Sequence, residues 1–433
     1  MMLAGTQMYF SAPFGNNVSA SGGTLTDPWT TIQGGNPLTS LAGLQGVGVY
    51  APNIPFPFSG TYVNTNMSNF HPVYMNQWNL SFQRQIGQDW LVSVNYLGNN
   101  TIHMITTENI NPSVYFPTQS QSVSPAGVVT STCTMPNGVS LTATGSQCST
   151  VGNAQTRRAM NLINTDQGRY YAGIGQIDDG GTASYEGLNL TVQKRLSRGI
   201  SASANYTLSH CLSDVYSDNP TAAGVSRPDN RRAFRSNCLG IDVRQIFNLN
   251  MVATTPKFSQ PALRALGSNW QFAPILQMKS AQFFSVYTGA DNALTTVGSQ
   301  TPNLVGNPYP QNQSVNHWID LAPFQATPPA PGTYGTVGYN TFKGPGVFQL
   351  NMAVSRTFTI RERQSIQLRA EAFNLPNHLN PFSPGVAPNA GQRSGNVSMT
   401  ASNFGQITND ISGNNGLTSG DYRVIQLALK FMF

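Results

Sequence analysis

Alternation of apolar and polar residues is the main pattern of this chain, and it is clearest in the last thirteen residues, 421–433. Side chains of a β-strand point to opposite faces in turn. One face of this segment is wholly apolar and consists of Ile425, Leu427, Leu429, Phe431 and Phe433. A half-buried strand of a soluble sandwich alternates in the same way. A strand between lipid and a polar lumen also explains the terminal aromatic residue.

The same alternation predicts eight earlier strands, which makes about nine strands in all. The predicted strands are 77–86, 90–98, 184–196, 200–211, 244–254, 269–280, 347–360, 365–375 and 421–433. Pro274 falls inside one of them and predicts a bulge or an unpaired position, because proline has no N–H to donate. The pattern predicts an all-β, antiparallel fold.

The predicted connections alternate strictly between short and long. The long loops are 99–183, 212–242, 287–346 and 377–420. Outer-membrane barrels sort their loops in this way, with short periplasmic turns and long extracellular loops, whereas soluble sandwiches do not. We therefore predict a transmembrane antiparallel β-barrel, present as about nine to ten strands of a larger barrel. Lys194 and Arg356 would face lipid, close enough to the short turns to snorkel.

Composition agrees with walls that face lipid on one side and water on the other. Only 9% of the residues are charged, against roughly 25% in ordinary soluble proteins, yet hydrophobic residues reach only 39%. Apolar runs fall far short of the roughly 18 residues that a spanning helix needs. The net charge of +6 is spread along the chain, so no basic cluster predicts nucleic-acid binding.

The predicted organisation is a loop-rich segment at 1–75 and a barrel portion at 76–433. Residues 1–10 lack the basic region and apolar core of a signal peptide. Since a barrel must be secreted, we expect either a removed leader or a fragment of a longer protein.

Several phrases, in order, carry a resemblance over roughly residues 70–433. They include MNQWNLSFQRQIGQDWLVSVNYLGNN, SYEGLNLTVQKRLSRGISASANYTLSHCLSD, TPNLVGNP, IQLRAEAFNLPNHLNPF and IQLALKFMF. The set resembles the C-terminal barrel of Oar-like TonB-dependent outer-membrane transporters of acidobacterial type. These carry a carboxypeptidase-regulatory-like domain and a plug upstream of a barrel of about 22 strands. The resemblance implies uptake of a bulky solute, powered through TonB.

The sequence departs from that pattern, since we find no plug, no N-terminal domain and no TonB-binding segment in it. An incomplete set of strands leaves two open edges, which lipid does not tolerate. A fragment is therefore the simplest expectation.

Four cysteines in a loop-rich secreted protein predict two disulfides, although four cysteines allow three pairings. We favour Cys133–Cys148 within one loop and Cys211–Cys238 across the base of the next. Each would contribute about 3 kcal/mol in the chain-entropy model. A zinc site is less favoured, because the chain has no Cys-x-x-Cys pair.

Catalytic and ion-binding patterns are weak. Ser209, His210 and Asp214 suggest a triad, but neighbouring residues of a strand point to opposite faces. Asp178, Asp179 and Asp410 could help to bind calcium, without the spacing of an EF-hand. Arg369 and Glu371 share one strand face and would point into the lumen, either as an ion pair or toward a solute or plug. Trp318 and Tyr334 are isolated aromatics that could stack on sugars.

We predict a non-enzymatic outer-membrane protein without cofactors. The leading hypothesis is TonB-dependent movement of a glycan, siderophore or peptide, with the final strand read by the barrel assembly machinery. The alternative is a non-transporting adhesin or structural surface protein, and a soluble sandwich is the third reading. Membrane lipid, the assembly machinery and TonB are the predicted partners.

Overall fold

The computed structural model describes most of the chain from residue 70 onward. The described residues are 24, 26–27, 30, 62–65, 70–169, 171–214, 227, 230–238, 240–296, 300–325, 331–361, 364–385, 395–411, 417 and 422–433. Most of the predicted segment 1–75 lies outside them, so its organisation stays a prediction.

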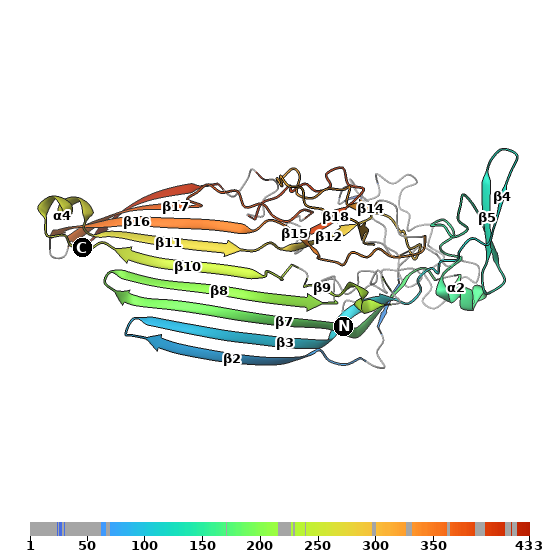
Figure 1. Ribbon diagram of the computed structural model, residues 1–433, viewed down its shortest axis with the longest axis horizontal. Helices are drawn as coiled ribbons and strands as arrows, with labels where there is room; N and C mark the ends of the chain where they lie inside the picture. Colours follow the sequence, from blue (N-terminus) through green and yellow to red (C-terminus); the bar gives the residue numbers. More distant parts are fainter. Residues whose placement is uncertain are drawn as a thin grey trace.

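Nine long antiparallel strands form one curved sheet whose order follows the chain (Figure 1). They are β2 (Tyr74–Ile86), β3 (Trp90–Asn109), β7 (Ile174–Ser197), β8 (Ile200–Ser213), β10 (Gln245–Thr254), β11 (Trp270–Lys279), β16 (Val347–Arg361), β17 (Gln364–Phe373) and β19 (Val424–Met432). The predicted strands and their antiparallel arrangement are confirmed. Long connections gather at one end of the sheet, and short ones gather at the other.

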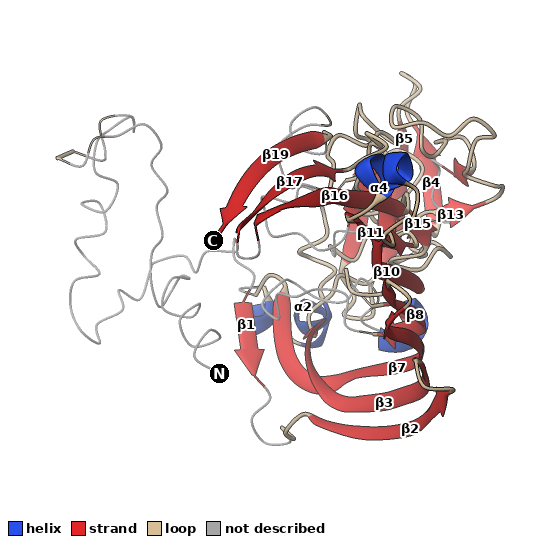
Figure 2. Cartoon of the chain, turned by 90° about the vertical axis from the view of Figure 1, so that its left-hand side faces the viewer, coloured by secondary structure: helices blue, strands red, loops and turns tan. Residues whose placement is uncertain are grey.

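Seen along its strands, the sheet is a C-shaped wall (Figure 2). Among the described residues, β2 and β19 each pair on one side only. Two short strands are added near the long-loop end: β1 (Tyr62–Thr65) runs parallel to the start of β7, and β9 (Ser236–Asn237) pairs with the end of β8. The predicted open edges are therefore present in this part of the chain.

The predicted loop 99–183 was too long, because β3 continues to Asn109 and β7 begins at Ile174. The two extensions pair with each other, as Thr107 with Ile177 shows. Their sequences lack apolar alternation. In the predicted barrel these extensions lie beyond the apolar band, where neither strand face would meet lipid and no period-two pattern is required.

The short-turn end contains one element that the sequence analysis missed. The connection between β10 and β11 contains the helix α4 (Pro261–Gly267), with proline in its first turn, where the missing N–H costs no hydrogen bond. By contrast, β7 and β8 are joined directly through Arg198 and Gly199, both at positive φ, as in tight hairpin turns. Pro274 lies at a gap in the β10–β11 ladder, and the register is the same on both sides. It is unpaired toward β10 but pairs with Met352 of β16, and it is not a bulge.

The register sorts the wall into two faces. The apolar face is defined by cross-strand rows such as Phe82, Val94, Leu190, Tyr206, Phe247, Met278 and Phe348. The polar face is defined by rows such as Gln83, Ser93, Thr191, Asn205, Asn248, Gln277 and Gln349. Large side chains of the apolar face are exposed, and Leu427 reaches 80%. The wall therefore buries no apolar core of its own.

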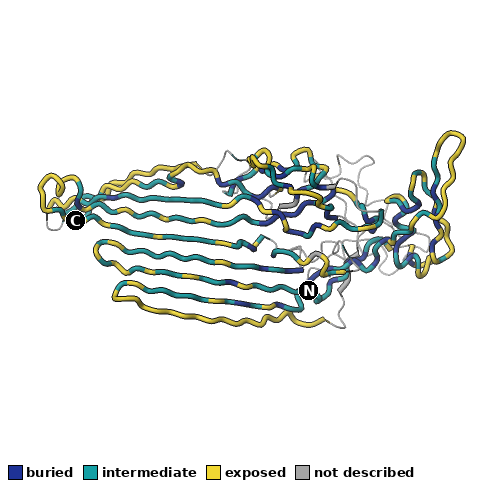
Figure 3. Tube along the Cα trace, viewed as in Figure 1, coloured by how far each residue is buried: buried dark blue, intermediate teal, exposed yellow. Residues whose placement is uncertain are grey.

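Buried apolar side chains gather instead at the long-loop end, which we call the crown (Figure 3). The crown comprises the described residues of 110–173, 214–244, 280–346 and 374–423. Its main core consists of Phe284, Val286, Ile319, Phe324, Val337, Phe342 and Val397.

The crown's regular elements are short. They are β4 (Ser120–Val123), β5 (Val129–Thr134), β6 (Ser140–Thr144), α2 (Ala159–Ile163), α3 (Thr165–Gly168), η2 (Arg231–Phe234), β12 (Phe283–Tyr287), β13 (Asn303–Leu304), β14 (Phe324–Gln325), β15 (Phe342–Lys343) and β18 (Gly395–Ser398). None of the helices in the described part of the chain has the length and apolarity needed to cross a membrane.

Candidate functional site: the polar wall and the crown

Hydrogen bonds between side chains run across the polar face. The Thr191 hydroxyl donates to Oδ1 of Asn205 at 2.8 Å, and the amide of Asn189 donates to the Thr207 hydroxyl at 3.0 Å. Farther along the sheet, the Gln277 amide donates to Oδ1 of Asn248 at 3.2 Å. Amides and hydroxyls both donate and accept. This surface is polar and almost free of formal charge, so it suits contact with water or neutral polar groups.

Two cations at the short-turn edge of the apolar face reach toward the turns. The Lys194 ammonium donates to the backbone oxygens of Ser197 at 3.0 Å and Ile200 at 2.9 Å. The Arg356 guanidinium donates to the backbone oxygen of Ala265 and lies 5.4 Å from the ring centre of Trp270. These contacts fit the predicted snorkelling, in which a charged head reaches the interface while its stem stays on the apolar surface; the position of the interface stays a prediction.

The crown's long connections are joined to one another near its base. The backbone N–H of Ser113 donates to the oxygen of Thr295 at 3.1 Å. The side chains of Asn237 and Asn340 each donate to the other's backbone oxygen, at 2.7 and 3.2 Å. Three loops that are distant in sequence therefore form one connected body.

Arg157 is the buried centre of one such junction. Its guanidinium is fully buried and donates to the backbone oxygens of Val114, Leu294 at 3.1 Å and Thr150 at 2.8 Å, and to Oδ1 of Asn153 at 2.9 Å. Burial lowers the pKa of Arg157 to about 10, because the charged form loses hydration. The arginine holds loop 110–173 against loop 280–346 by hydrogen bonds to backbone.

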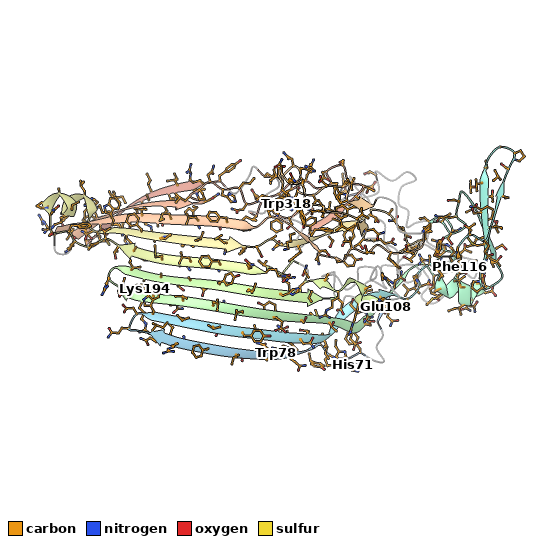
Figure 4. All side chains as sticks on the ribbon, in the orientation of Figure 1. His71, Trp78, Glu108, Phe116, Lys194 and Trp318 are labelled. Carbon is orange, nitrogen blue, oxygen red and sulfur yellow. A yellow bond between two sulfur atoms is a disulfide. The ribbon has the colours of Figure 1, made fainter. Side chains whose placement is uncertain are left out.

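A cavity of 570 Å³ lies at this junction. Its lining includes Glu108 at the end of β3, Ser113, Tyr115, Thr295 and Tyr334. Figure 4 shows Glu108 between the wall and the outer crown. The lining of this concave surface thus includes two phenol rings, two hydroxyls and one carboxylate, so it is the candidate small-molecule site of the crown.

Two other hollows lie along the sheet. A hollow of 260 Å³ lies where β11 and β16 meet the crown, beside Gln277, Lys279 and Ser383. One of 450 Å³ lies toward the short-turn end, over the ladder gap at Pro274, and residues of both sheet faces line it.

Both disulfides lie at the long-loop end and are the pairs that the sequence analysis favoured. Cys133–Cys148 joins β5 to the segment after β6. It lies in a small core with Met135 and Leu141. Cys211–Cys238 joins the end of β8 to the residue after β9.

The side chains of His71, His103 and Asp179 meet at the crown end of β2, β3 and β7, which we call the rim. No sequence motif connects these three residues. Nδ1 of His71 lies 2.7 Å from Oδ2 of Asp179, and Nδ1 of His103 lies 3.2 Å from the same oxygen. The backbone N–H of His71 also donates to Oδ2 at 2.7 Å. This backbone hydrogen bond and that of the His71 imidazole hold the pKa of the Asp179 carboxyl below its usual range.

The weak catalytic and calcium patterns do not come together. The Ser209 hydroxyl donates to the Val243 backbone, and Asp214 accepts from the Thr182 hydroxyl at 2.9 Å. His210 faces Glu186 across the ladder. Asp178 instead pairs with Arg231, while Asp410 is buried beside Pro381.

The remaining predicted residues have local roles. The Nε–H of Arg369 donates to Oε1 of Glu371 at 2.6 Å, so the two form an ion pair on the polar face. The Trp318 indole N–H donates to the backbone oxygen of Lys343 at 2.9 Å and packs on the crown core, which is a structural role. Tyr334, by contrast, lines the 570 Å³ cavity.

The final strand pairs with β17 along its whole length. Its apolar set, Ile425, Leu427, Leu429 and Phe431, lies opposite apolar partners of β17. The role of this strand, with Phe433, as an assembly signal stays a prediction.

Comparison with known protein families decides the class of this protein. A family model for the outer membrane beta barrel domain matches residues 2–426. The chain belongs to this outer-membrane β-barrel family. The protein is therefore a non-enzymatic protein of the outer membrane, its polar face is the lumen wall, and the crown is its extracellular end. A search of curated proteins gives no match.

Two solved structures are similar in part. The outer membrane transporter YddB from Escherichia coli has 12% identity and a TM-score of 0.38, with 86% of this chain and 34% of that chain covered. A mutant of the ferric enterobactin receptor from Pseudomonas aeruginosa has 10% identity and a TM-score of 0.32, with 83% and 30% covered. The chain spans about a third of the length of these proteins.

Proposed function

We propose that this chain forms part of the wall and extracellular entrance of an outer-membrane transporter for a bulky, largely uncharged solute. The observation that carries the proposal is the continuous polar face, with its amide and hydroxyl rows, below a crown that has its own cavity. A lumen wall of this kind offers exchangeable hydrogen bonds without a strong electrostatic trap. A glycan or a neutral peptide fits that chemistry better than a highly charged siderophore.

Energy would come from the inner membrane through TonB and a plug domain, which is not among the described residues. The resemblance of the strand phrases to Oar-like transporters supports this step. The lumen wall itself would bind and guide the solute without chemical change, and barrel assembly would begin from the final strand.

The test measures uptake by cells that produce the protein from its own gene, with and without a protonophore. The probes are fluorescent neutral oligosaccharides, short peptides and a hydroxamate siderophore. We expect energy-dependent uptake of one neutral class, reduced by Tyr115→Ala or Tyr334→Ala in the cavity. Val151→Ala is the matched control, since Val151 is an exposed crown residue away from that lining. Equal uptake by cells with and without the protein would refute transport.

A second candidate is an adhesin, favoured by the arm formed by β4, β5 and β6. This arm projects from the far end of the crown (Figure 1), and every residue of β4 is exposed. Val123→Asp should then reduce cell attachment to surfaces and leave uptake unchanged, whereas the transport proposal expects no change in either.

A further inference from the structure

The rim cluster of His71, His103 and Asp179 brings together three different parts of the wall. His71 precedes β2, His103 lies in β3, and Asp179 lies in β7. Figure 4 shows His71 at the crown end of β2, beside the outermost strands. The three candidate ligand atoms all lie within 4.8 Å of one another, and none of these residues takes part in the cavity described above.

The spacing is close to that of a tetrahedral metal site. Ligand atoms at about 2.0–2.2 Å from one zinc ion lie roughly 3.2–3.6 Å apart. The separation of 3.2 Å between His103 and Asp179 already meets this value. The separation of 2.7 Å between His71 and Asp179 must open slightly. The His71 side chain is 61% exposed, so it can turn without disturbing a core.

The backbone at His103 is in an uncommon conformation. His103 has a φ of 59°, in the left-handed region that residues other than glycine seldom adopt. The β3–β7 ladder shifts register between Thr101 and Met104, and again between Met104 and Thr106. Bulges re-aim side chains and recur next to functional sites. Here the bulged segment places the His103 ring 4.7 Å from the His71 ring, with both facing Asp179.

Asp179 supplies the carboxylate of the cluster, because the other acidic side chains near it are paired with an arginine. Asp178 and Glu108 are both paired with Arg231. A site with two imidazoles and one carboxylate has a single formal negative charge, and nitrogen ligands favour zinc, copper or nickel over calcium or magnesium.

We propose that His71, His103 and Asp179 bind a divalent transition metal of the zinc class at the extracellular rim. Three protein ligands leave one of the usual four positions for water or for a donor group of a solute. The bound metal would fix the start of β2 to β3 and β7 at the open edge of this wall. The proposal does not depend on transport.

The test is zinc binding by the full chain, purified in detergent, in competition with a chromophoric chelator. We expect one zinc per chain, and binding at least about tenfold weaker in His71→Ala, His103→Ala and Asp179→Asn. The matched control is His317→Ala, because the exposed crown pair of His317 and Asp320 has no third candidate ligand among the described residues. This variant should keep the wild-type affinity for zinc.

Cobalt gives a second readout, since a tetrahedral site with two histidines produces visible absorption bands. His71→Ala alters an exposed side chain outside every strand, so it should keep the fold, which gel migration of unheated samples checks. Wild-type affinity in His71→Ala and Asp179→Asn, or loss of binding in His317→Ala alone, would overturn the proposal. Zinc binding only at millimolar concentrations would also overturn it.

Discussion

The indole of Trp78 on β2 lies across Gly98 on β3, the residue directly opposite in the antiparallel register. A Cβ at residue 98 would overlap the indole nitrogen of Trp78 and come within 2.6 Å of Oε2 of Glu186. The Tyr96 hydroxyl donates to the same carboxylate. The glycine thus makes room on the apolar face for an aromatic side chain at the extracellular boundary, where outer-membrane barrels carry aromatic girdles.

Gly98→Ala is therefore expected to displace the indole and to lower the free energy of unfolding by about 1–3 kcal/mol. Trp78→Ala removes the overlapping ring, so the double variant should be more stable than the sum of the two single effects predicts. Urea unfolding in lipid vesicles, followed by gel migration, measures these differences. Strict additivity would show that the two residues do not compete for space.

The assignment of the two faces predicts an asymmetry between neighbouring residues of β7. Leu190→Arg places a charge on the lipid face and should cost about 2–4 kcal/mol, whereas Thr191→Arg places it in the lumen at little cost. Leu190 pairs with Val94 and Tyr206, whereas Thr191 pairs with Ser93 and Asn205. Unfolding of both variants in vesicles measures the contrast, and equal destabilisation would contradict the face assignment.

Arg157→Met should loosen the crown and leave the wall intact. The methionine fills part of the volume but leaves the backbone oxygens of Thr150 and Leu294 without their donor. Each buried acceptor without a partner costs about 1–3 kcal/mol. We expect faster cleavage of loop 110–173 by chymotrypsin, with Arg157→Lys intermediate because it keeps the charge but has fewer donors. Unchanged cleavage would rule out Arg157 as the anchor of this junction.

Alkaline pH should destabilise the crown through Tyr287. Burial raises the pKa of Tyr287 to about 12, while the Ser285 side chain opposes the shift. The folded state therefore binds this proton more tightly than the unfolded chain, whose tyrosines titrate near 10. The contribution of neutral Tyr287 to the free energy of unfolding is fully present below pH 10 and is lost between about pH 10 and 12. The absorbance of tyrosinate should show a late-titrating group that is absent in Tyr287→Phe.

Much of the wall was predictable because a strand between lipid and lumen needs side chains that alternate without interruption. Leu188, Leu190 and Val192 carry that signal in the sequence, and the register places them on one face. The extension of β3 to Asn109 had no such signal, because above the apolar band both faces can be polar. Helix α4 was missed because its seven residues are too few to show a helical period.

The residues of the candidate site also fall into two groups, those that the sequence predicts and those that it does not. The cysteine pairs and the Arg369–Glu371 ion pair could be predicted, since each joins residues that are near in sequence or on one strand face. Arg157 was missed because its acceptor at Leu294 is 137 residues away. His71 and Asp179 are 108 residues apart, with no motif between them.

By itself, the sequence determined the strands, their faces and the alternation of short and long connections, because the bilayer imposes a local period-two pattern on each strand. Only the tertiary structure decided which loops join around Arg157, where the crown cavity forms, and that two histidines meet one aspartate at the rim. These arrangements depend on register and bulges between distant segments, and local periodicity carries no information about them.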